Sequence, residues 1–439
     1  MTGGGPLAGT RIVDLTMGWA GPLGTLLFAD LGAEVIKLEG PGRLDWWRGG
    51  SVSQPNPDMS DLEQKMWERS PVFSGVNRNK RELVVDMKTD AGKALFEKLV
   101  AASDAVVESF SPRVLQGWGL GYERLRELNE QIILMSLPAV GSDGPWSHYV
   151  GYASTTEALA GLPALCGYEG EGPILQTPSI ADPLAGLNGA VALMMALLER
   201  DLTGRGQRIE VAHLEAAVPL IGEAFMDYVM NQRVRERCGN GDPTIAPNGC
   251  FPCAGDDRWV VICVETDDDW QRLCRVIGDD ALAADSRFAT RPGRVANVAE
   301  VEAAVVRWTS TRAPREAMAA LQAAGVIAAA LNNEADLLDD PQVIAAEGFA
   351  RIERDYVGTH PYPNITVKLS RTPGEIRRPA PLFGEDNLYV LRDVLGLDDA
   401  EIERLFVDEV VSDTPSHAGW ARLSAFSGQL TRHTPAPSS

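Results

Sequence analysis

The chain has 439 residues, of which 45% are hydrophobic and 23% charged, as is usual for a soluble globular protein of two or three domains. Its formal net charge of −21 argues against nucleic acid or an anionic membrane surface as a partner. The longest apolar run, residues 190–198, is too short to span a bilayer, and six cysteines in a chain of this size suggest reduced thiols. We therefore expect a cytoplasmic protein with no membrane contact.

Strand and helix patterns alternate through the first half of the chain. The sequence predicts helices over 21–32, 90–103 and 122–129, and strands over 10–16, 33–39, 81–87, 105–110 and 131–137. Such alternation predicts an α/β fold with a parallel sheet covered on both faces. Residues 40–80, rich in Pro, Gly, Asp and Trp, are expected to form a functional loop or an arm.

The second half of the chain predicts a linker followed by a compact unit. A turn, a short strand and a helix are expected within 203–218, and a linker over 231–249. Then come a strand, three amphipathic helices, a further strand and two last helices, at 259–265, 270–278, 298–309, 314–325, 365–370, 386–395 and 399–406. From about residue 412 the composition predicts a flexible tail.

One carboxylate stands at the start of a long apolar helix, in "QTPSIADPLAGLNGAVALMMALLER" (176–200). Asp182 immediately precedes Pro183, and this pair is typical of a helix N-cap followed by proline at the first helical position. The same position also suits a carboxylate that attacks a substrate. The residues alone leave both interpretations open.

Three other patterns suggest ligand sites, each with a structural alternative. "GWAGPLG" (18–24) followed by Glu39 is similar to a dinucleotide fingerprint, but its glycine spacing is imperfect. Cations at 78, 80, 81 and 88 suit phosphates or, equally, a solvated turn. Cys250 and Cys253 form a lone CxxC with no second pair, so we expect no metal site.

Several motifs in order resemble the class III coenzyme A transferase family (CaiB/BaiF type), which includes formyl-CoA:oxalate and carnitine CoA-transferases. They are "LAGTRIVDLTMGWAGP" (7–22), "GAEVIKLEGPG" (32–42), "NRNKRELVVDMKTDAGK" (77–93), "SIADPLAGLNGA" (179–190) and "LERDLTGRGQRIEVAHLEAA" (198–217). "DSRFATRPGRVAN" (285–297) and "RRPAPLFGED" (377–386) add to the resemblance.

The resemblance implies a Rossmann-like large domain and a smaller inserted α/β domain in an interlocked homodimer. It implies these boundaries: large domain 1–230, linker 231–246, small domain 247–332, linker and return to the large domain 333–411, and tail 412–439.

The family's chemistry implies that Asp182 is the nucleophile. It would attack the thioester of an acyl-CoA donor to give a mixed anhydride, then form an aspartyl-CoA thioester that a carboxylic acid acceptor opens. Coenzyme A and acyl-CoA are then substrates, with no tightly bound cofactor. The resemblance assigns CoA contacts to Ala20, Val85, Asp86, Met87, Lys88, Ser109, Phe110, Ser111, Val150, Gly151 and Tyr152, and the acyl pocket to Trp19 and Tyr152.

Departures from the family pattern bear on specificity. Trp19 replaces the glutamine of the formyl-CoA:oxalate enzyme, which suggests a larger acyl group, and Glu157 stands where many members carry glutamine. The related α-methylacyl-CoA racemases keep the aspartate, which makes a racemase or epimerase the alternative function. Their second base is a histidine, and Tyr152 at the matching position leaves two-base proton exchange without a partner. A nicotinamide-dependent dehydrogenase is more remote.

Overall fold

The structure, a computed structural model, describes residues 4–49 and 63–431. The chain packs into two units. The first comprises residues up to 162 together with 176–222 and 347 onward, and the second comprises 163–175 and 223–346. The second unit contains the whole of the small domain expected at 247–332, and it starts earlier and ends later than that range.

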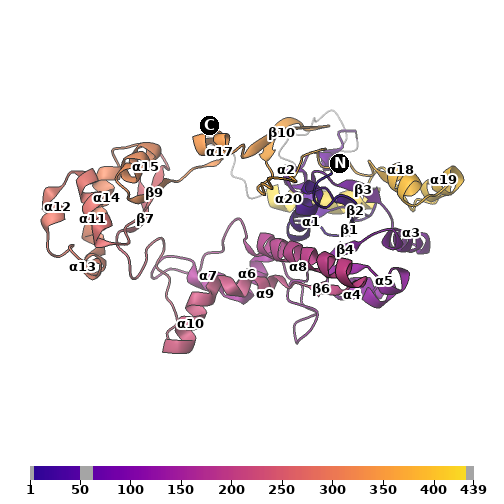
Figure 1. Ribbon diagram of the computed structural model, residues 1–439, viewed down its shortest axis with the longest axis horizontal. Helices are drawn as coiled ribbons and strands as arrows, with labels where there is room; N and C mark the ends of the chain where they lie inside the picture. Colours follow the sequence, from indigo (N-terminus) through magenta and orange to yellow (C-terminus); the bar gives the residue numbers. More distant parts are fainter. Residues whose placement is uncertain (1–3, 50–62, 432–439) are drawn as a thin grey trace. The chain divides into compact units, whose positions relative to one another are not determined.

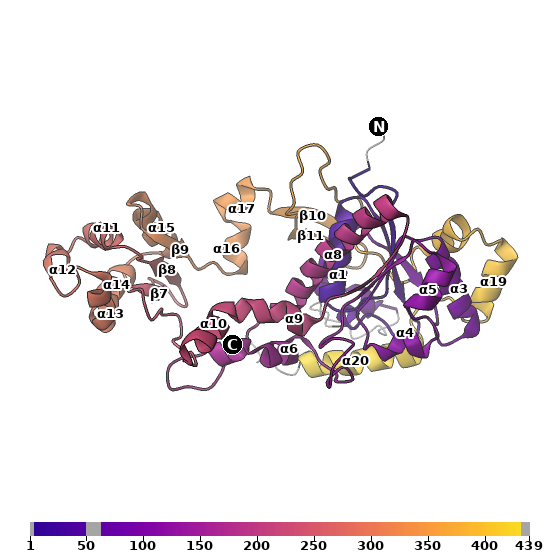
Figure 2. The same ribbon diagram turned by 60° about the horizontal axis from the view of Figure 1, so that its bottom comes forward.

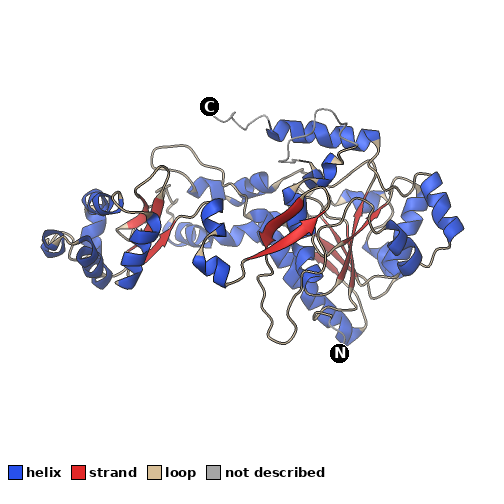
Figure 3. Cartoon of the chain, turned by 90° about the horizontal axis from the view of Figure 1, so that it is seen from above, coloured by secondary structure: helices blue, strands red, loops and turns tan. Residues whose placement is uncertain are grey.

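A six-stranded parallel sheet forms the centre of the first unit (Figure 3). Its order is β3-β2-β1-β4-β5-β6. The strands are β1 (Arg11–Asp14), β2 (Glu34–Glu39), β3 (Arg81–Val84), β4 (Ala105–Glu108), β5 (Ile133–Ser136) and β6 (Arg208–Glu210). This is the Rossmann order, in which the chain reverses direction across the sheet between β1 and β4. The expected parallel α/β sheet is confirmed.

Helices cover both faces of this sheet (Figure 1). Alternate strand residues explain the two layers, because successive side chains point to opposite faces. Ile12 and Val107 pack with α1 (Ala20–Asp30) and α8 (Ala181–Thr203). On the other face, Val13 and Val106 pack in one core with α3 (Asp90–Ala101), α5 (Tyr122–Leu128) and α19 (Asp399–Val407).

Shorter elements complete the first unit. They are the 3₁₀ turns η1 (Trp46–Arg48), η2 (Met66–Glu68) and η3 (Val218–Ile221), the π-helical turn η4 (Val390–Val394), the hairpin strands β10 (Phe349–Arg354) and β11 (Gly358–Pro363), and the helices α2 (Pro71–Asn77), α4 (Arg113–Gly117), α6 (Ala153–Ala160), α9 (His213–Ala217), α18 (Asn387–Tyr389) and α20 (His417–Thr431). Helices α7 (Leu162–Leu165) and α10 (Gly222–Asn231) lie where the chain passes between the units.

Two local predictions are wrong. The strand expected at 365–370 is irregular, and the hairpin β10–β11 forms just before it. The tail expected to be flexible forms α20 over 417–431, where Trp420 packs edge-on against the buried Trp67 with ring centroids 5.7 Å apart. Packing of the partly buried Trp420 stabilises this helix, although the surrounding sequence is rich in polar residues. Residues 432–439, and 50–62 of the expected arm, lie outside the described residues.

The second unit has its own core around an antiparallel sheet, β7-β8-β9. The strands are β7 (Asn248–Pro252), β8 (Trp259–Cys263) and β9 (Ile327–Ala330), and the helices are α11 (Asp267–Ile277), α12 (Asp280–Ala284), α13 (Arg291–Ala296), α14 (Val298–Thr309), α15 (Pro314–Ala323), α16 (Glu334–Leu338) and α17 (Pro341–Ala345). Cys250 and Cys253 lie on and directly after β7 as free thiols, and burial raises the pKa of both. They behave here as small packing residues.

Helix α8 lies directly against α1 (Figure 2). Gly186 permits this contact, because a Cβ there would stand 2.2 Å from the carbonyl oxygen of Ala20. In the part of the chain that the structure describes, α8 alone is long and apolar enough to cross a membrane, with a mean hydropathy of 1.5 and 44% of its most apolar window buried. Core helices of soluble proteins have the same composition, so this is weak support for a membrane span.

Candidate active site

A cavity of about 280 Å³ opens at the carboxyl ends of the central strands. It is lined by the segments that follow three neighbouring strands, namely 17–20 after β1, 109–112 after β4 and 137–141 after β5. Asp182 of α8 and His213 of α9 complete the wall. Ligands of open α/β sheets bind in this crevice, where the strand order reverses, so the topology selects this cavity as the candidate site.

Asp182 is not the N-cap of α8, contrary to the simplest interpretation of the sequence. Ile180 occupies the N-cap position, and the helix begins at Ala181. The cap comes instead from Glu157 of α6, whose Oε1 accepts hydrogen bonds from the Ile180 N–H at 2.7 Å, the Ala181 N–H at 3.0 Å and the Ser179 hydroxyl at 2.6 Å. Because a distant carboxylate satisfies the helix start, the carboxylate of Asp182 is free for other contacts.

We expect Glu157→Ala to lower turnover by about tenfold or more, since the segment before Asp182 would lose three hydrogen bonds at a buried site. Glu157→Gln keeps an acceptor oxygen and should retain most of the activity. Steady-state kinetics of the two variants check this, with circular dichroism as the control for folding. Equal activity of the alanine variant and the unaltered protein would show that this cap does not position Asp182.

The carboxylate of Asp182 has one side-chain contact among the described residues. Its Oδ1 lies 3.2 Å from Nδ1 of His213, and the two side chains are 17% and 12% exposed. His213 was not among the residues that the sequence motifs placed at the site. The only available signal was its place in "EVAHLEAA", just after an expected strand.

Most residues expected at the site line this cavity. These are Trp19, Ala20, Ser109, Phe110, Ser111, Val150, Gly151, Tyr152 and Asp182. Trp46, which was not expected, also lines it and stands edge-on to the ring of Tyr152, with centroids 6.3 Å apart. Aromatic side chains therefore line the same cavity as the carboxylate of Asp182, and Tyr152 is 63% exposed.

The segment Val85–Lys88 does not line the cavity. Val85 and Met87 are buried, and Val85 forms a bridge with Val411. Lys88 is exposed, and its Nζ would stand 4.0 Å from a Cβ placed on Gly42. Arg43 follows Gly42 and is the one lysine or arginine among the described lining residues. The Lys88 ammonium therefore lies close to Gly42, the residue before Arg43; Arg43 lines the cavity and Lys88 does not.

The other cations of the expected phosphate cluster are used inside the fold. Arg78 is 4% exposed and pairs with Asp30 through both guanidinium Nη2 and Nε. Lys80 is fully buried and lies 2.9 Å from Oδ2 of Asp14. Arg81 stacks on the ring of Tyr389. Neither a phosphate role nor a solvated turn fits Arg78 and Lys80, because a buried cation needs an internal partner.

The dinucleotide interpretation is also wrong in its key residue. The side chain of Glu39 is 1% exposed, and its Oε1 lies 2.8 Å from Nε of Arg48. It also accepts the backbone N–H of Asp45. A carboxylate held in this way cannot reach the ribose of a nucleotide, so no dehydrogenase site is formed here.

Glu108, the last residue of β4, holds the backbone of the segment that follows this strand. Burial is the largest effect on this carboxyl group and raises its pKa to about 6, while hydrogen bonds from Ser136 and from the backbone N–H of Phe110 oppose the rise. The Phe110 N–H donates to Oε2 of Glu108 at 2.7 Å. This contact fixes the start of the 109–111 wall of the cavity.

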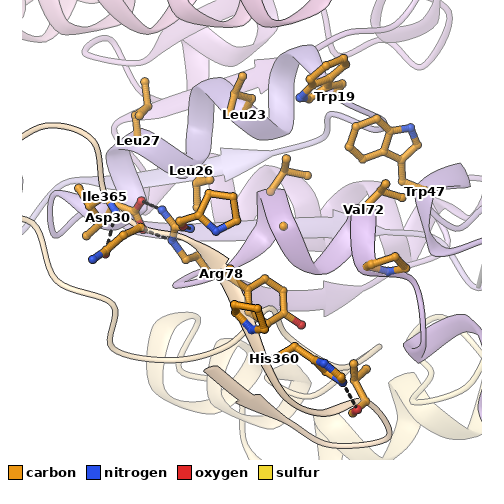
Figure 4. A pocket seen from close by; sticks show the side chains of 18 of the residues that line it. Trp19, Leu23, Leu26, Leu27, Asp30, Trp47, Val72, Arg78, His360 and Ile365 are labelled. Carbon is orange, nitrogen blue, oxygen red and sulfur yellow. Dashed lines mark hydrogen bonds and ion pairs between the residues drawn. The ribbon is translucent and has the colours of Figure 1, made fainter. Parts of the chain in front are cut away.

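A larger apolar cavity of about 870 Å³ adjoins the site through a shared residue, Trp19. Figure 4 shows Trp19, Leu23 and Leu27 following one another along α1, with the Asp30–Arg78 ion pair at the far end. The hairpin β10–β11 supplies the facing wall around His360. Trp19 therefore stands between a polar cavity that contains Asp182 and an apolar one that does not.

Comparisons with known proteins agree on one family. The sequence profile of CoA-transferase family III matches residues 7–387. A probable CoA-transferase of Mycobacterium tuberculosis is 36% identical over 93% of this chain, which spans about half (51%) of that relative. The succinyl-CoA–D-citramalate CoA-transferase of Chloroflexus aurantiacus is 32% identical over 92% of this chain and 98% of its own. A crystal structure of a CaiB/BaiF family protein from Brucella suis has a TM-score of 0.78 at 31% identity, covering 89% of this chain and all of that one.

Proposed function

The chain belongs to CoA-transferase family III, and from this premise we propose that it moves coenzyme A from an acyl-CoA donor to a carboxylic acid with Asp182 as the covalent nucleophile. One observation carries the proposal. The carboxylate of Asp182 lines the cavity at the carboxyl ends of the strands, with Oδ1 held by His213 and with Oδ2 free of side-chain partners in the described chain. An oxygen without a competing hydrogen bond is available to attack a carbonyl carbon.

The proposed reaction balances without a metal or an external activating group. Oδ2 of Asp182 bonds to the donor's acyl carbon, the C–S bond breaks, and its electron pair leaves on the CoA thiolate. The thiolate attacks Cγ of Asp182 and releases the donor acid, leaving an aspartyl-CoA thioester. The acceptor carboxylate then attacks Cγ and expels the thiolate, which finally takes the acceptor's acyl group and regenerates the carboxylate. Each step exchanges one activated acyl bond for another.

We place the coenzyme along the wall formed by Ala20 and the 109–111 segment, which line the cavity. Arg43 and Lys88 are the cations available for its phosphates, since the neighbouring Arg78 and Lys80 are already paired. Lys88 thus keeps its expected contact with the coenzyme, and Arg43 takes the place of the other cations of the expected phosphate cluster.

The acyl group would meet Trp19 and Tyr152. Succinyl-CoA is the first donor to test, because a relative named for that donor is similar over nearly its whole length. Trp19 also borders the larger apolar cavity, which supports donors with bulkier acyl groups as the second set. The six free cysteines are compatible with the reducing cytoplasm, where we place the enzyme.

Peptide mass spectrometry tests the mechanism directly. The enzyme is mixed with succinyl-CoA, other aliphatic acyl-CoAs and aromatic acyl-CoAs, and is then quenched with hydroxylamine or borohydride. We expect the peptide containing Asp182 to carry a hydroxamate or an alcohol with each active donor. Failure of all donors to label that peptide while product forms would contradict the covalent mechanism.

The racemase alternative makes a different prediction. Two-base proton exchange needs the substrate carbon between the two bases. Asp182 and His213 are the acid–base pair in the cavity, but their facing atoms are 3.2 Å apart, which leaves no room for a carbon atom between them. We expect no α-proton exchange into D₂O with a branched acyl-CoA, and exchange without labelling of Asp182 would favour the racemase.

We also propose that two copies form an interlocked homodimer. One face of α8 exposes an apolar stripe at helical spacing, formed by Leu187, Val191, Met194, Met195, Leu198 and Leu202. A contiguous apolar stripe of this kind usually marks a protein interface. Light scattering should give twice the chain mass for the unaltered protein and for Glu123→Arg, an exposed control on α5 on the other face of the sheet, whereas Leu198→Arg should shift it toward the single-chain mass. A single-chain mass for the unaltered protein would contradict the proposal.

A further inference from the structure

His213 is held rigidly beside the catalytic carboxylate. Its backbone N–H donates to the carbonyl oxygen of Pro138 at 3.0 Å, and the next N–H, of Leu214, donates to Ala139 at 3.0 Å. These bonds anchor the first turn of α9 to the segment that leaves β5. The imidazole is 12% exposed and faces Asp182, so its position is set by the fold rather than by solvent.

The surroundings of the ring identify which nitrogen carries the proton. Nδ1 lies 3.2 Å from Oδ1 of Asp182, whereas Nε2 is buried with no hydrogen-bond partner. A lone pair on Nδ1 would face the carboxylate, and an N–H at Nε2 would be a buried donor without an acceptor. Both costs disappear when Nδ1 is protonated. His213 therefore presents an Nδ1–H to Oδ1 of Asp182.

The other donors expected at a helix start are not available to this oxygen. The N–H groups of Ile180 and Ala181 donate to Glu157, and Pro183 has no N–H. His213 is thus the one side-chain donor within hydrogen-bond distance of the Asp182 carboxylate among the described residues.

We infer that His213 serves the covalent intermediates as the hydrogen-bond donor to Oδ1 of Asp182. This inference rests on the proposed function and extends it. Once Oδ2 is acylated, Oδ1 is the carbonyl oxygen of the anhydride, and it remains the carbonyl oxygen of the aspartyl-CoA thioester. When the CoA thiolate or the acceptor carboxylate attacks Cγ, the electron pair of this C=O bond moves onto Oδ1. An N–H on Nδ1, 3.2 Å from that oxygen, would stabilise the developing charge.

A donor to Oδ1 affects the two chemical steps differently, namely acylation of Asp182 and the later attack on its Cγ. Formation of the first anhydride places negative charge on the donor's carbonyl oxygen, not on Oδ1, so it does not depend on the His213 donor. Attack on Cγ does depend on it. Loss of the donor should therefore leave the enzyme able to acylate Asp182 but slow to discharge it.

Three substitutions at this position separate donation from packing. His213→Leu fills a similar volume without a donor, and His213→Ala removes both volume and donor. His213→Asn places an amide nitrogen on Cγ, the same atom that carries Nδ1, and so restores a donor near the original position. Rapid quench with hydroxylamine, followed by peptide mass spectrometry, measures the acylated fraction of Asp182 over time.

We expect the leucine variant to form labelled Asp182 and to discharge it about 100-fold more slowly than the unaltered enzyme, the usual effect of removing one such donor. kcat should fall by the same factor. KM for the donor acyl-CoA should fall with it, because acylation is unchanged and the acylated enzyme accumulates. Asparagine should recover most of the loss. If leucine prevents folding, alanine and asparagine give the same comparison.

Two outcomes would overturn different claims. Discharge rates within threefold of the unaltered enzyme in both the leucine and alanine variants, with Asp182 still labelled, would refute the role of His213 and leave the nucleophile in place. A complete lack of label on Asp182 in the unaltered enzyme, during turnover, would instead refute the proposed function on which the inference rests.

Discussion

Replacing Asp182 by asparagine should abolish CoA transfer while coenzyme A still binds. Asparagine keeps the size of the side chain and an oxygen that can accept the Nδ1–H of His213, which in the unaltered chain lies 3.2 Å from Oδ1. It cannot form the anhydride, because an amide is a poor nucleophile toward a thioester. Loss of a covalent nucleophile typically lowers kcat by about 10⁴-fold or more.

The control for this prediction is binding rather than turnover. Thermal-shift titration with coenzyme A should give dissociation constants within a few-fold for Asp182→Asn, Asp182→Ala and the unaltered protein, since the proposed contacts at Arg43 and the 109–111 segment do not involve this side chain. Turnover by the asparagine variant at more than about one per cent of the normal rate would contradict covalent catalysis by Asp182.

The sequence was most informative about the central sheet. The strands at 33–39 and 105–110 were predicted within two residues of β2 and β4, because buried parallel strands are short apolar runs between helical segments. The hairpin β10–β11 was missed because its strand at 358–363 contains two prolines and is mostly exposed, so no alternation of apolar residues marks it.

Only part of the site was predicted, because its other residues carry no local sequence signal. Motif resemblance located Asp182, but the groups that prepare it come from other elements. Glu157 binds backbone N–H groups 23 and 24 residues further along the chain, those of Ile180 and Ala181, and His213 contacts Asp182 from the start of α9. Asp–Pro at the start of an apolar helix favours the N-cap interpretation locally, and only the tertiary structure shows that another carboxylate takes that role.

A buried ionic network supports the aromatic wall of the site. Arg48, which closes η1 directly after Trp46 and Trp47, is fully buried and stacks on Phe73 with its guanidinium carbon 3.8 Å from the ring centroid. Among the described residues, five carboxylates and four cations share the network. Their ion pairs are Asp14–Lys80, Lys37–Asp45, Glu39–Arg48, Glu68–Arg48, Glu82–Arg48 and Glu68–Arg354. With every group ionised it would carry one net negative charge away from water. One proton would neutralise it.

Glu82 is the group that takes this proton. Burial and the neighbouring carboxylate of Glu39 raise the pKa of Glu82 well above its ordinary value, although Arg48 opposes the rise. For comparison, burial would also raise the pKa of Asp14, but Lys80 and Lys37 hold it at about 2. The two carboxyl groups differ because Asp14 has a lysine of its own, whereas Glu82 shares Arg48 with Glu39 and Glu68.

Arg48→Met should therefore strongly destabilise this unit. It leaves the carboxylates of Glu39 and Glu68, which lie 2.8 and 3.0 Å from the guanidinium, without their shared cation in a fully buried site. Breaking one side of a buried ion pair costs about 3–5 kcal/mol. We expect a large drop in the urea midpoint of the first unit, followed by tryptophan fluorescence, and little recovery in Arg48→Lys, because an ammonium cannot reproduce the forked contacts.

Glu82→Gln is the matched variant that tests the charge argument itself. A neutral amide replaces a carboxyl group that is already protonated, so stability below about pH 5 should change by less than about 1 kcal/mol. A raised pKa in the folded protein means that its stability falls as the pH rises from the unfolded value through the folded one. The unaltered chain should thus lose stability relative to Glu82→Gln as the pH rises above the ordinary carboxyl value of 4.5. Equal pH profiles for the two proteins would show that Glu82 is ionised, and the network would then carry its net negative charge in the folded state.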